Sequence, residues 1–153
     1  MRPAVDATIR AAIAQQNHDL LDAAASDYAA SRKYDTAQEL LENSLTIRAR
    51  TSGENSSAYA EGLLKLGDLS ARRGKTADAV DFYKRAVALG NSSQIAPALV
   101  YLARQSLETQ DLPAAETYID RALAIAPTGK AAGQALTVKG NIALANGLPE
   151  WPN

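Results

Sequence analysis

Residues 63–89 read LLKLGDLSARRGKTADAVDFYKRAVAL, and their pattern of apolar and small residues indicates the fold most clearly. On both sides of Gly74, apolar and small residues recur every three or four positions, which is the spacing of one face of an α-helix. Gly74 itself suits the left-handed residue that commonly follows a helix C-terminus. The stretch therefore predicts two helices joined by a tight turn.

The same pattern occurs on both sides of this stretch. A copy that begins at Leu99 follows the one that begins at Leu63 by 36 residues, and a looser copy that begins at Leu21 precedes it by 42 residues. A partial copy begins at Leu136, 37 residues after Leu99. Repeats of this length are the signature of stacked supersecondary units, so we expect a helical array.

Each copy combines large and small residues in a way that lets two helices approach closely. Leu66-Gly67 and Leu102-Ala103 place a small residue beside a large one in the first helix. The second helix carries alanines seven residues apart, which share one helix face: Ala79, Ala86, Ala115 and Ala122. We expect these small residues to form the contact within each hairpin.

Turn residues and large side chains add detail to this pattern. Thr76 or Asp35 can cap the helix that follows a turn, and Pro113 suits a first helical turn, where no backbone donor is needed. We interpret Tyr28 and Tyr83 as core residues and Tyr118 as a residue at the rim of the core. The large aliphatic residues assigned to the core are Leu66, Leu102, Leu123 and Ile125.

This register resembles the tetratricopeptide repeat, whose consensus has a large-x-x-large-small run in helix A, then Gly, Ala, an aromatic residue, Ala and a Pro near the end of the unit. The resemblance covers about residues 18–147. The 42-residue spacing is similar to the longer repeat of kinesin light chains, without the His-Pro pair often found in their loop. The resemblance implies an all-α protein, a right-handed α-solenoid of antiparallel helix hairpins with about three such units and flanking helices.

The repeat register also predicts the boundaries of the units. We expect an N-terminal cap helix or partial repeat over 1–17, three repeats over 18–55, 56–92 and 93–128, a C-terminal solvating helix over 129–147 and a tail over 148–153. The expected helices are 4–16, 18–31, 35–50, 56–73, 76–89, 95–110, 113–125 and 129–146.

Composition and motifs favour a non-catalytic protein. The chain has 16 Lys and Arg against 17 Asp and Glu, which argues against a dedicated nucleic-acid surface. It has no cysteine, and His18 is its single histidine, at an expected helix start, so the chain offers a poor set of metal ligands. A Ser-His-acid triad could use only His18, and no Gly-x-Ser-x-Gly elbow is present. No phosphate-binding loop is present either. We expect no enzyme activity, no cofactor and no metal.

The resemblance implies that a protein or peptide partner binds along a concave groove lined by the first helices of the hairpins. The central part of the array, from Leu64 to Glu108, is the favoured part of this groove. The carboxylate clamp of the heat-shock-chaperone class is absent, and Asp22 and Asp68 would repel a carboxylate at short range. The candidate groove residues are Asp22, Ser26, Leu64, Asp68, Arg72, Val100, Tyr101, Arg104, Glu108 and Asn141.

Two other classes of function stay open: a structural or self-associating module, and the regulatory domain of a larger protein. The C-terminal helix could be a cap, with Trp151 loosely held and the chain monomeric, which we favour. Alternatively it is an open edge, with Leu136 and Leu144 exposed to a second copy in a homodimer. No segment is apolar and long enough for a membrane span or a signal peptide. A cytoplasmic location and export with the signal removed both remain, and the partner's identity is open.

Overall fold

The computed structural model describes residues 2–90 and 92–147, and within these residues it contains helices and no strand. The all-α fold class predicted from the sequence is therefore confirmed. The predicted tail over 148–153, with Trp151, lies outside the described residues. No helix in the described part of the chain is long and apolar enough to cross a membrane.

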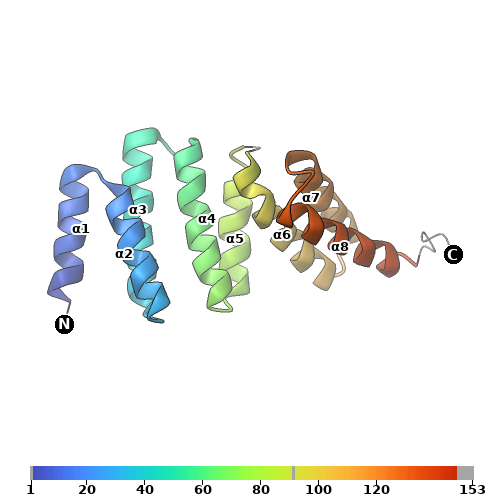
Figure 1. Ribbon diagram of the computed structural model, residues 1–153, viewed down its shortest axis with the longest axis horizontal. Coiled ribbons are helices and arrows are strands. Elements are labelled where there is room, and N and C mark those ends of the chain that lie inside the picture. Colours follow the sequence, from blue (N-terminus) through green and yellow to red (C-terminus); the bar gives the residue numbers. More distant parts are fainter. Residues whose placement is uncertain (1, 91, 148–153) are drawn as a thin grey trace. The chain divides into compact units, whose positions relative to one another are not determined.

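Helices follow one another with short connections along the described chain (Figure 1). Their ends differ by at most two residues from those expected from the sequence, because the apolar periodicity marks each helix directly. In order they are α1 (Pro3–Gln15), α2 (His18–Ala30), α3 (Tyr34–Ser52), α4 (Ser57–Arg72), α5 (Thr76–Val87), the short 3-10 helix η1 (Ser93–Ile95), α6 (Ala96–Glu108), α7 (Leu112–Ile125) and α8 (Lys130–Ala145).

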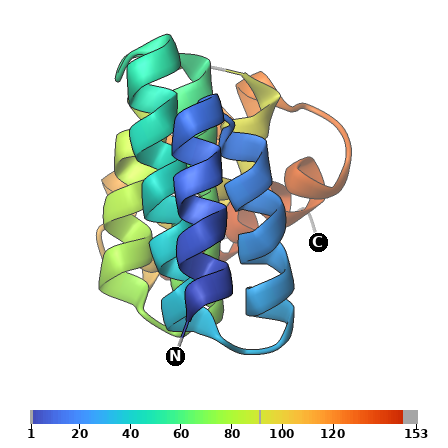
Figure 2. The same cartoon turned by 90° about the vertical axis from the view of Figure 1, so that its left-hand side faces the viewer.

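The chain divides into two compact units, Met1–Leu89 and Gly90–Asn153. In the first unit, α2 pairs with α3 and α4 pairs with α5, while α3 packs on α4 and α1 packs on α2 and α3 (Figure 2). In the second unit, α6 pairs with α7, and α8 packs on both of them. Each unit is thus built from antiparallel helix hairpins, the building block of an α-solenoid.

The turns inside the three hairpins share one backbone conformation. Gly74 has a φ of 72°, and Arg32 and Gln110, at the corresponding positions, have φ values of 61° and 62°. After each of them a backbone N–H bonds back to a carbonyl in the last helical turn, as from Lys75 N to Ser70 O at 2.9 Å. This is the Schellman ending of a helix, which satisfies carbonyls that would otherwise lack a donor.

The predicted caps at Thr76 and Asp35 are wrong. The helices begin at Thr76 and Tyr34, so that Lys75 and Lys33 occupy the N-cap positions without a side-chain bond. The left-handed residue is followed directly by the N-cap, which starts each helix earlier than a Thr76 or Asp35 cap would require. In the third hairpin Asp111 does cap the helix, accepting a bond from Ala114 N at 3.2 Å.

The alanines expected at the helix contacts are all fully buried: Ala79, Ala86, Ala115 and Ala122. Leu66, Leu102 and Tyr83 are buried and Tyr118 is half-buried, as predicted. Tyr28 is only half-buried and packs against the core of the first unit, which corrects its assignment to the core. Leu123 and Ile125 are only half-buried, which corrects their assignment to the core. The buried large residue of α7 is Ile119, because this helix packs through the face that carries Ala115, Ile119 and Ala122.

The second hairpin shows why a small residue is needed beside Leu66. A Cβ atom on residue 67 would lie 2.6 Å from Cε1 and 2.7 Å from Cδ1 of the Tyr83 ring. Carbon atoms normally approach to about 3.5–4.0 Å. The absent side chain of Gly67 therefore makes the space that the ring of α5 occupies.

Candidate binding groove

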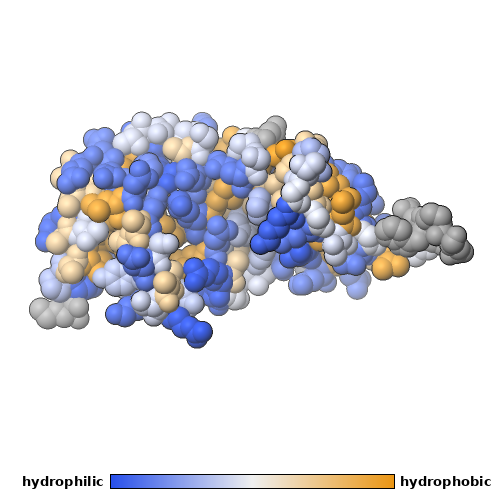
Figure 3. Space-filling view, viewed as in Figure 1, coloured by the Kyte–Doolittle hydropathy of each residue, from blue (hydrophilic) through white to orange (hydrophobic). Residues whose placement is uncertain are grey.

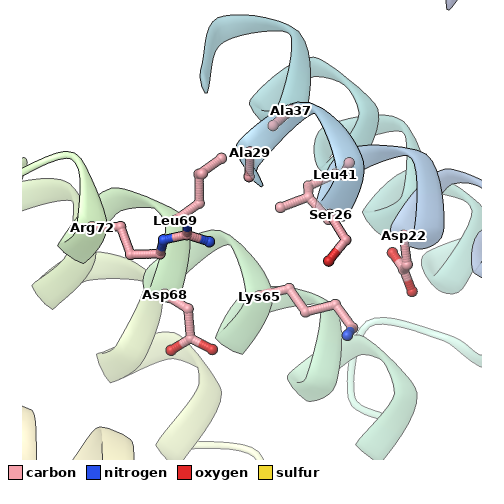
Figure 4. Close-up of a pocket in the computed structure, with 10 residues that line it drawn as sticks. Asp22, Ser26, Ala29, Ala37, Leu41, Lys65, Asp68, Leu69 and Arg72 are labelled. Atoms are coloured by element: carbon pink, nitrogen blue, oxygen red, sulfur yellow. The ribbon is translucent and has the colours of Figure 1, made fainter. Parts of the chain in front are cut away.

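The first unit contains a pocket of about 130 Å³ between α2, α3 and α4 (Figure 4). Four predicted groove residues line it, Asp22 and Ser26 from α2 and Asp68 and Arg72 from α4. The remaining lining residues are the small or aliphatic Ala25, Ala29, Ala37, Leu41 and Leu69, together with Lys65. The structure thus brings together groove residues that are more than 40 positions apart in the sequence.

Asp22 is held by a buried network that the sequence did not reveal. Arg48 is 1% exposed, and its Nη2 donates a hydrogen bond to Asp22 Oδ2 at 2.7 Å. Ser44 Oγ donates to Asp22 Oδ1 at 2.6 Å. The buried guanidinium therefore compensates the negative charge of Asp22, and both bonds fix the position of its carboxylate. Asp22 thus lines the pocket without presenting an uncompensated charge to a ligand.

The same arginine also joins α3 to α4. Arg48 Nη1 donates to the backbone oxygen of Ala58 at 2.7 Å and lies 3.4 Å from Glu61 Oε2. Its aliphatic part passes so close to Gly62 that a Cβ there would lie 2.8 Å from Arg48 Cδ. The available sequence signal was an arginine seven and eleven residues after the buried positions 41 and 37, on the core face of α3.

The charged residues that α4 contributes to the pocket differ in their partners. Tyr83 donates its hydroxyl hydrogen to Asp68 Oδ1, so this carboxylate is bonded to the second helix of its own hairpin. Lys65 is half-buried and Arg72 is exposed, and within the described residues neither has a hydrogen-bond or ion-pair partner. Lys65 reaches along the pocket toward Ser26 and Asp22 (Figure 4). The pocket is thus lined by two unpaired cations together with alanine and leucine side chains.

Two predicted groove residues are buried and do not offer a surface to a partner. Leu64 is 9% exposed and Val100 is 2% exposed. They occupy the same repeat position as Asp22, whose side chain is 11% exposed. The physical reason is that α4 packs on both α3 and α5, and α6 packs on both α7 and α8, so each first helix is buried over more than one face. The position one helical turn further along each helix is exposed in all three copies, at Ser26, Asp68 and Arg104.

The second unit carries the other predicted groove residues. Arg104 and Glu108 are exposed on α6, Tyr101 is half-buried on the same helix, and Asn141 is exposed on α8.

In the first unit, the side chains on the face viewed in Figure 3 mix hydrophilic and hydrophobic character without a large continuous hydrophobic area. A surface of this kind suits polar contacts with a partner more than a dry, permanent interface.

His18 begins α2, as expected, and Asn17 caps this helix by accepting a bond from Leu20 N at 3.3 Å. His18 Nδ1 lies 3.1 Å from Asp19 Oδ1 and 3.5 Å from Asp22 Oδ2, so these three residues could be considered as cation ligands. Arg48 Nη2, however, already donates to the same Asp22 oxygen. A cation there would face the guanidinium, which argues against a metal site.

Comparison with known proteins agrees with the hairpin architecture. The sequence model of the tetratricopeptide repeat matches residues 11–92, which is more than half of the chain. The crystal structure of BtubC (BKLC) from P. vanneervenii is similar to 90% of this chain and to 66% of its own, with 20% identity and a TM-score of 0.59. PilF of Pseudomonas aeruginosa is similar over 93% of this chain and 60% of its own, with 16% identity and a TM-score of 0.67.

These two likenesses concern the fold alone. The chain spans slightly less than two thirds of the length of each of the two solved structures. No curated protein sequence matches the chain significantly. The kinesin-light-chain-like spacing of 42 residues stays a prediction.

Proposed function

We propose, because the chain belongs to the tetratricopeptide repeat family, that it is a non-catalytic scaffold whose first unit holds a segment of a protein partner in the pocket between α2 and α4. Proteins of this family generally serve protein interaction rather than catalysis. The observation that carries the proposal is the pair of unpaired cations, Lys65 and Arg72, beside the alanine and leucine side chains that line the pocket.

The size of the pocket favours a peptide side chain over a small-molecule ligand. Pockets for drug-sized molecules and cofactors measure about 300–1,000 Å³, whereas this one measures about 130 Å³. One aliphatic side chain of an extended segment fits that volume, with the rest of the segment lying along the exposed turns at Ser26 and Asp68.

Charge indicates which groups of the segment would be recognised. Arg48 compensates Asp22, so the expected repulsion of a carboxylate by Asp22 is largely cancelled. The Asp68 carboxylate accepts a hydrogen bond from the Tyr83 hydroxyl. Lys65 and Arg72 then favour acceptors, namely backbone carbonyls and an acidic side chain.

We further propose that the repeats divide as the sequence pattern predicts, over 18–55, 56–92 and 93–128. The pairing of α2 with α3, α4 with α5 and α6 with α7 supports this division. The exposed groove residues of the second unit, Arg104, Glu108 and Asn141, are proposed as further contacts to the partner.

A selection of peptides from a random phage-displayed library against the wild-type chain tests the proposal. Selected peptides should bind a Lys65→Ala/Arg72→Ala variant at least tenfold more weakly. The matched control is Arg50→Ala/Lys75→Ala, which removes two exposed cations of the same unit outside the pocket and should bind as the wild type does. Failure to enrich any peptide, or equal binding by the pocket variant, would overturn the proposal.

A further inference from the structure

The last helix of the described chain carries exposed leucines on one face. Leu136 is 58% exposed and Leu144 is 65% exposed, which makes them the two most exposed large hydrophobic residues among those described. They lie eight residues apart on α8 with Gly140 midway, so all three share one side of the helix. Exposed leucines that gather on one helix face indicate an interaction surface more than scattered single ones do.

The repeat itself shows what normally covers this face. Leu136 corresponds to Leu63 of α4 and Leu99 of α6, which are 1% and 0% exposed. Gly140 corresponds to Gly67, which lies against the Tyr83 ring of α5. In α4, this face is therefore the one on which the second helix of the hairpin packs. α8 presents the corresponding face with both of its leucines exposed.

Another side of α8 packs against the other helices of its own unit. Ala132, Ala135, Val138 and Ile142 are buried, and α8 packs on α6 and α7. At the border, Lys139 Nζ lies 3.4 Å from Asp120 Oδ1 of α7. Since α8 is anchored through another face, a partner can dock on Leu136 and Leu144 without displacing any part of the hairpin beneath.

We propose that this surface, which we call the α8 face (Leu136, Gly140 and Leu144), binds an amphipathic helix supplied by a partner protein. The chemistry of that helix follows from α5 and α7, the helices that pair with the equivalent first helices. Both carry a small residue, a large one four positions later and a small one three positions after that: Ala79, Tyr83 and Ala86 in α5, and Ala115, Ile119 and Ala122 in α7. Gly140 occupies the repeat position of Gly67, which lies against the Tyr83 ring, so an aromatic large residue is favoured in the docking helix.

The charge of α8 says which end of the docking helix is acidic. The charged residues of α8 are Lys130 and Lys139, and Lys139 is already paired with Asp120 of α7. Lys130 is therefore the cation of this helix without an ion-pair partner among the described residues, and an acidic residue of the docking helix near Lys130 is favoured, as is usual where potentials are complementary across an interface. The α8 face is separate from the pocket between α2 and α4, so this inference goes beyond the proposed function and does not depend on it.

A peptide with the packing residues of α5 provides the probe. It keeps positions 76–89 at Ala79, Tyr83 and Ala86, has Ala, Glu and Lys elsewhere to stabilise the helix, and is acetylated, amidated and fluorescently labelled. Fluorescence anisotropy should show saturable binding to the full chain. Leu136→Glu/Leu144→Glu should weaken that binding at least tenfold, whereas the pocket variant Lys65→Ala/Arg72→Ala should bind the peptide as the wild type does.

The matched control is Gln134→Glu/Ala145→Glu, which adds the same two negative charges to another side of α8 and should leave the affinity within about twofold. Absence of binding at millimolar peptide, or equal weakening in both α8 variants, would overturn the proposal. Light scattering over a tenfold range of chain concentration tests a second copy as the occupant. A dimer of the wild type that Leu136→Glu/Leu144→Glu dissociates would replace the partner helix by a second chain and refute the assignment.

Discussion

Replacing Gly67 with alanine should destabilise the second hairpin, although alanine is the better helix former. In a helix interior alanine is favoured over glycine by about 1 kcal/mol. At this position, however, the new Cβ would lie 2.6 Å from the Tyr83 ring, about 1 Å closer than an ordinary carbon contact. Tyr83 is 5% exposed and bonded to Asp68, so the ring cannot simply swing into solvent.

The expected magnitude follows from these opposing effects. Overpacking a well-filled contact costs about 1–3 kcal/mol, so Gly67→Ala should lose about 1 kcal/mol after the gain in helix propensity is included. Gly133 is the matched control, because it lies in α8 and no atom lies within 4 Å of the position that a Cβ would take there. Gly133→Ala should therefore gain about 1 kcal/mol. The two glycine-to-alanine changes should thus act in opposite directions and differ by about 2 kcal/mol.

A compensating change tests the same contact more strictly. The third hairpin has Ala103 and Ile119 where the second has Gly67 and Tyr83. Gly67→Ala/Tyr83→Ile reproduces that pair, so it should be more stable than the sum of the single effects by about 0.5–3 kcal/mol. Urea unfolding followed by circular dichroism measures all the variants. If Gly67→Ala stabilises as much as Gly133→Ala, or if the double variant is additive, the close approach of α4 and α5 is refuted.

Three further changes test other parts of the account. Ala79→Leu should overpack the same hairpin and cost about 1–3 kcal/mol by urea unfolding, and a silent substitution would show that the repeat register is wrong. Arg48→Leu should cost about 3 kcal/mol, because it leaves the carboxylate of Asp22 without its buried partner, and adding Asp22→Asn should restore part of the loss; an unchanged unfolding midpoint would contradict the network. Arg72→Ala with Arg104→Ala should weaken binding of a selected peptide while the melting temperature stays within about 1 °C, since exposed charges contribute little to stability.

The sequence predicted the helices and the turns well because their causes are local. Apolar spacing places each helix, and a left-handed residue ends it, as at Gly74. The buried alanines could be predicted equally well from the sequence, since the spacing of Ala79 and Ala86 recurs in the next copy. The helix caps expected at Thr76 and Asp35 were wrong, because the position of a cap depends on the backbone of the preceding turn.

The exposure of the candidate groove residues was predicted only in part, because exposure depends on how many helices surround a position. Ser26 and Asp68 are exposed as expected, whereas Leu64 and Val100 are buried by helices on more than one side. The role of Arg48 was missed, because an arginine in a helix is usually solvated, and only packing shows that Gly62 makes room for it. Single-sequence periodicity identifies a helix face but not what lies against it.

Amide chemical shifts of the chain, recorded while a selected peptide is added, show whether the pocket binds the peptide. We expect the largest shifts to fall on Ser26, Lys65, Asp68 and Arg72, around the pocket between α2 and α4, and we expect Lys65→Ala/Arg72→Ala to remove them. Shifts confined to the exposed sides of α5 or α7, with the pocket residues unmoved at saturation, would contradict binding in this pocket.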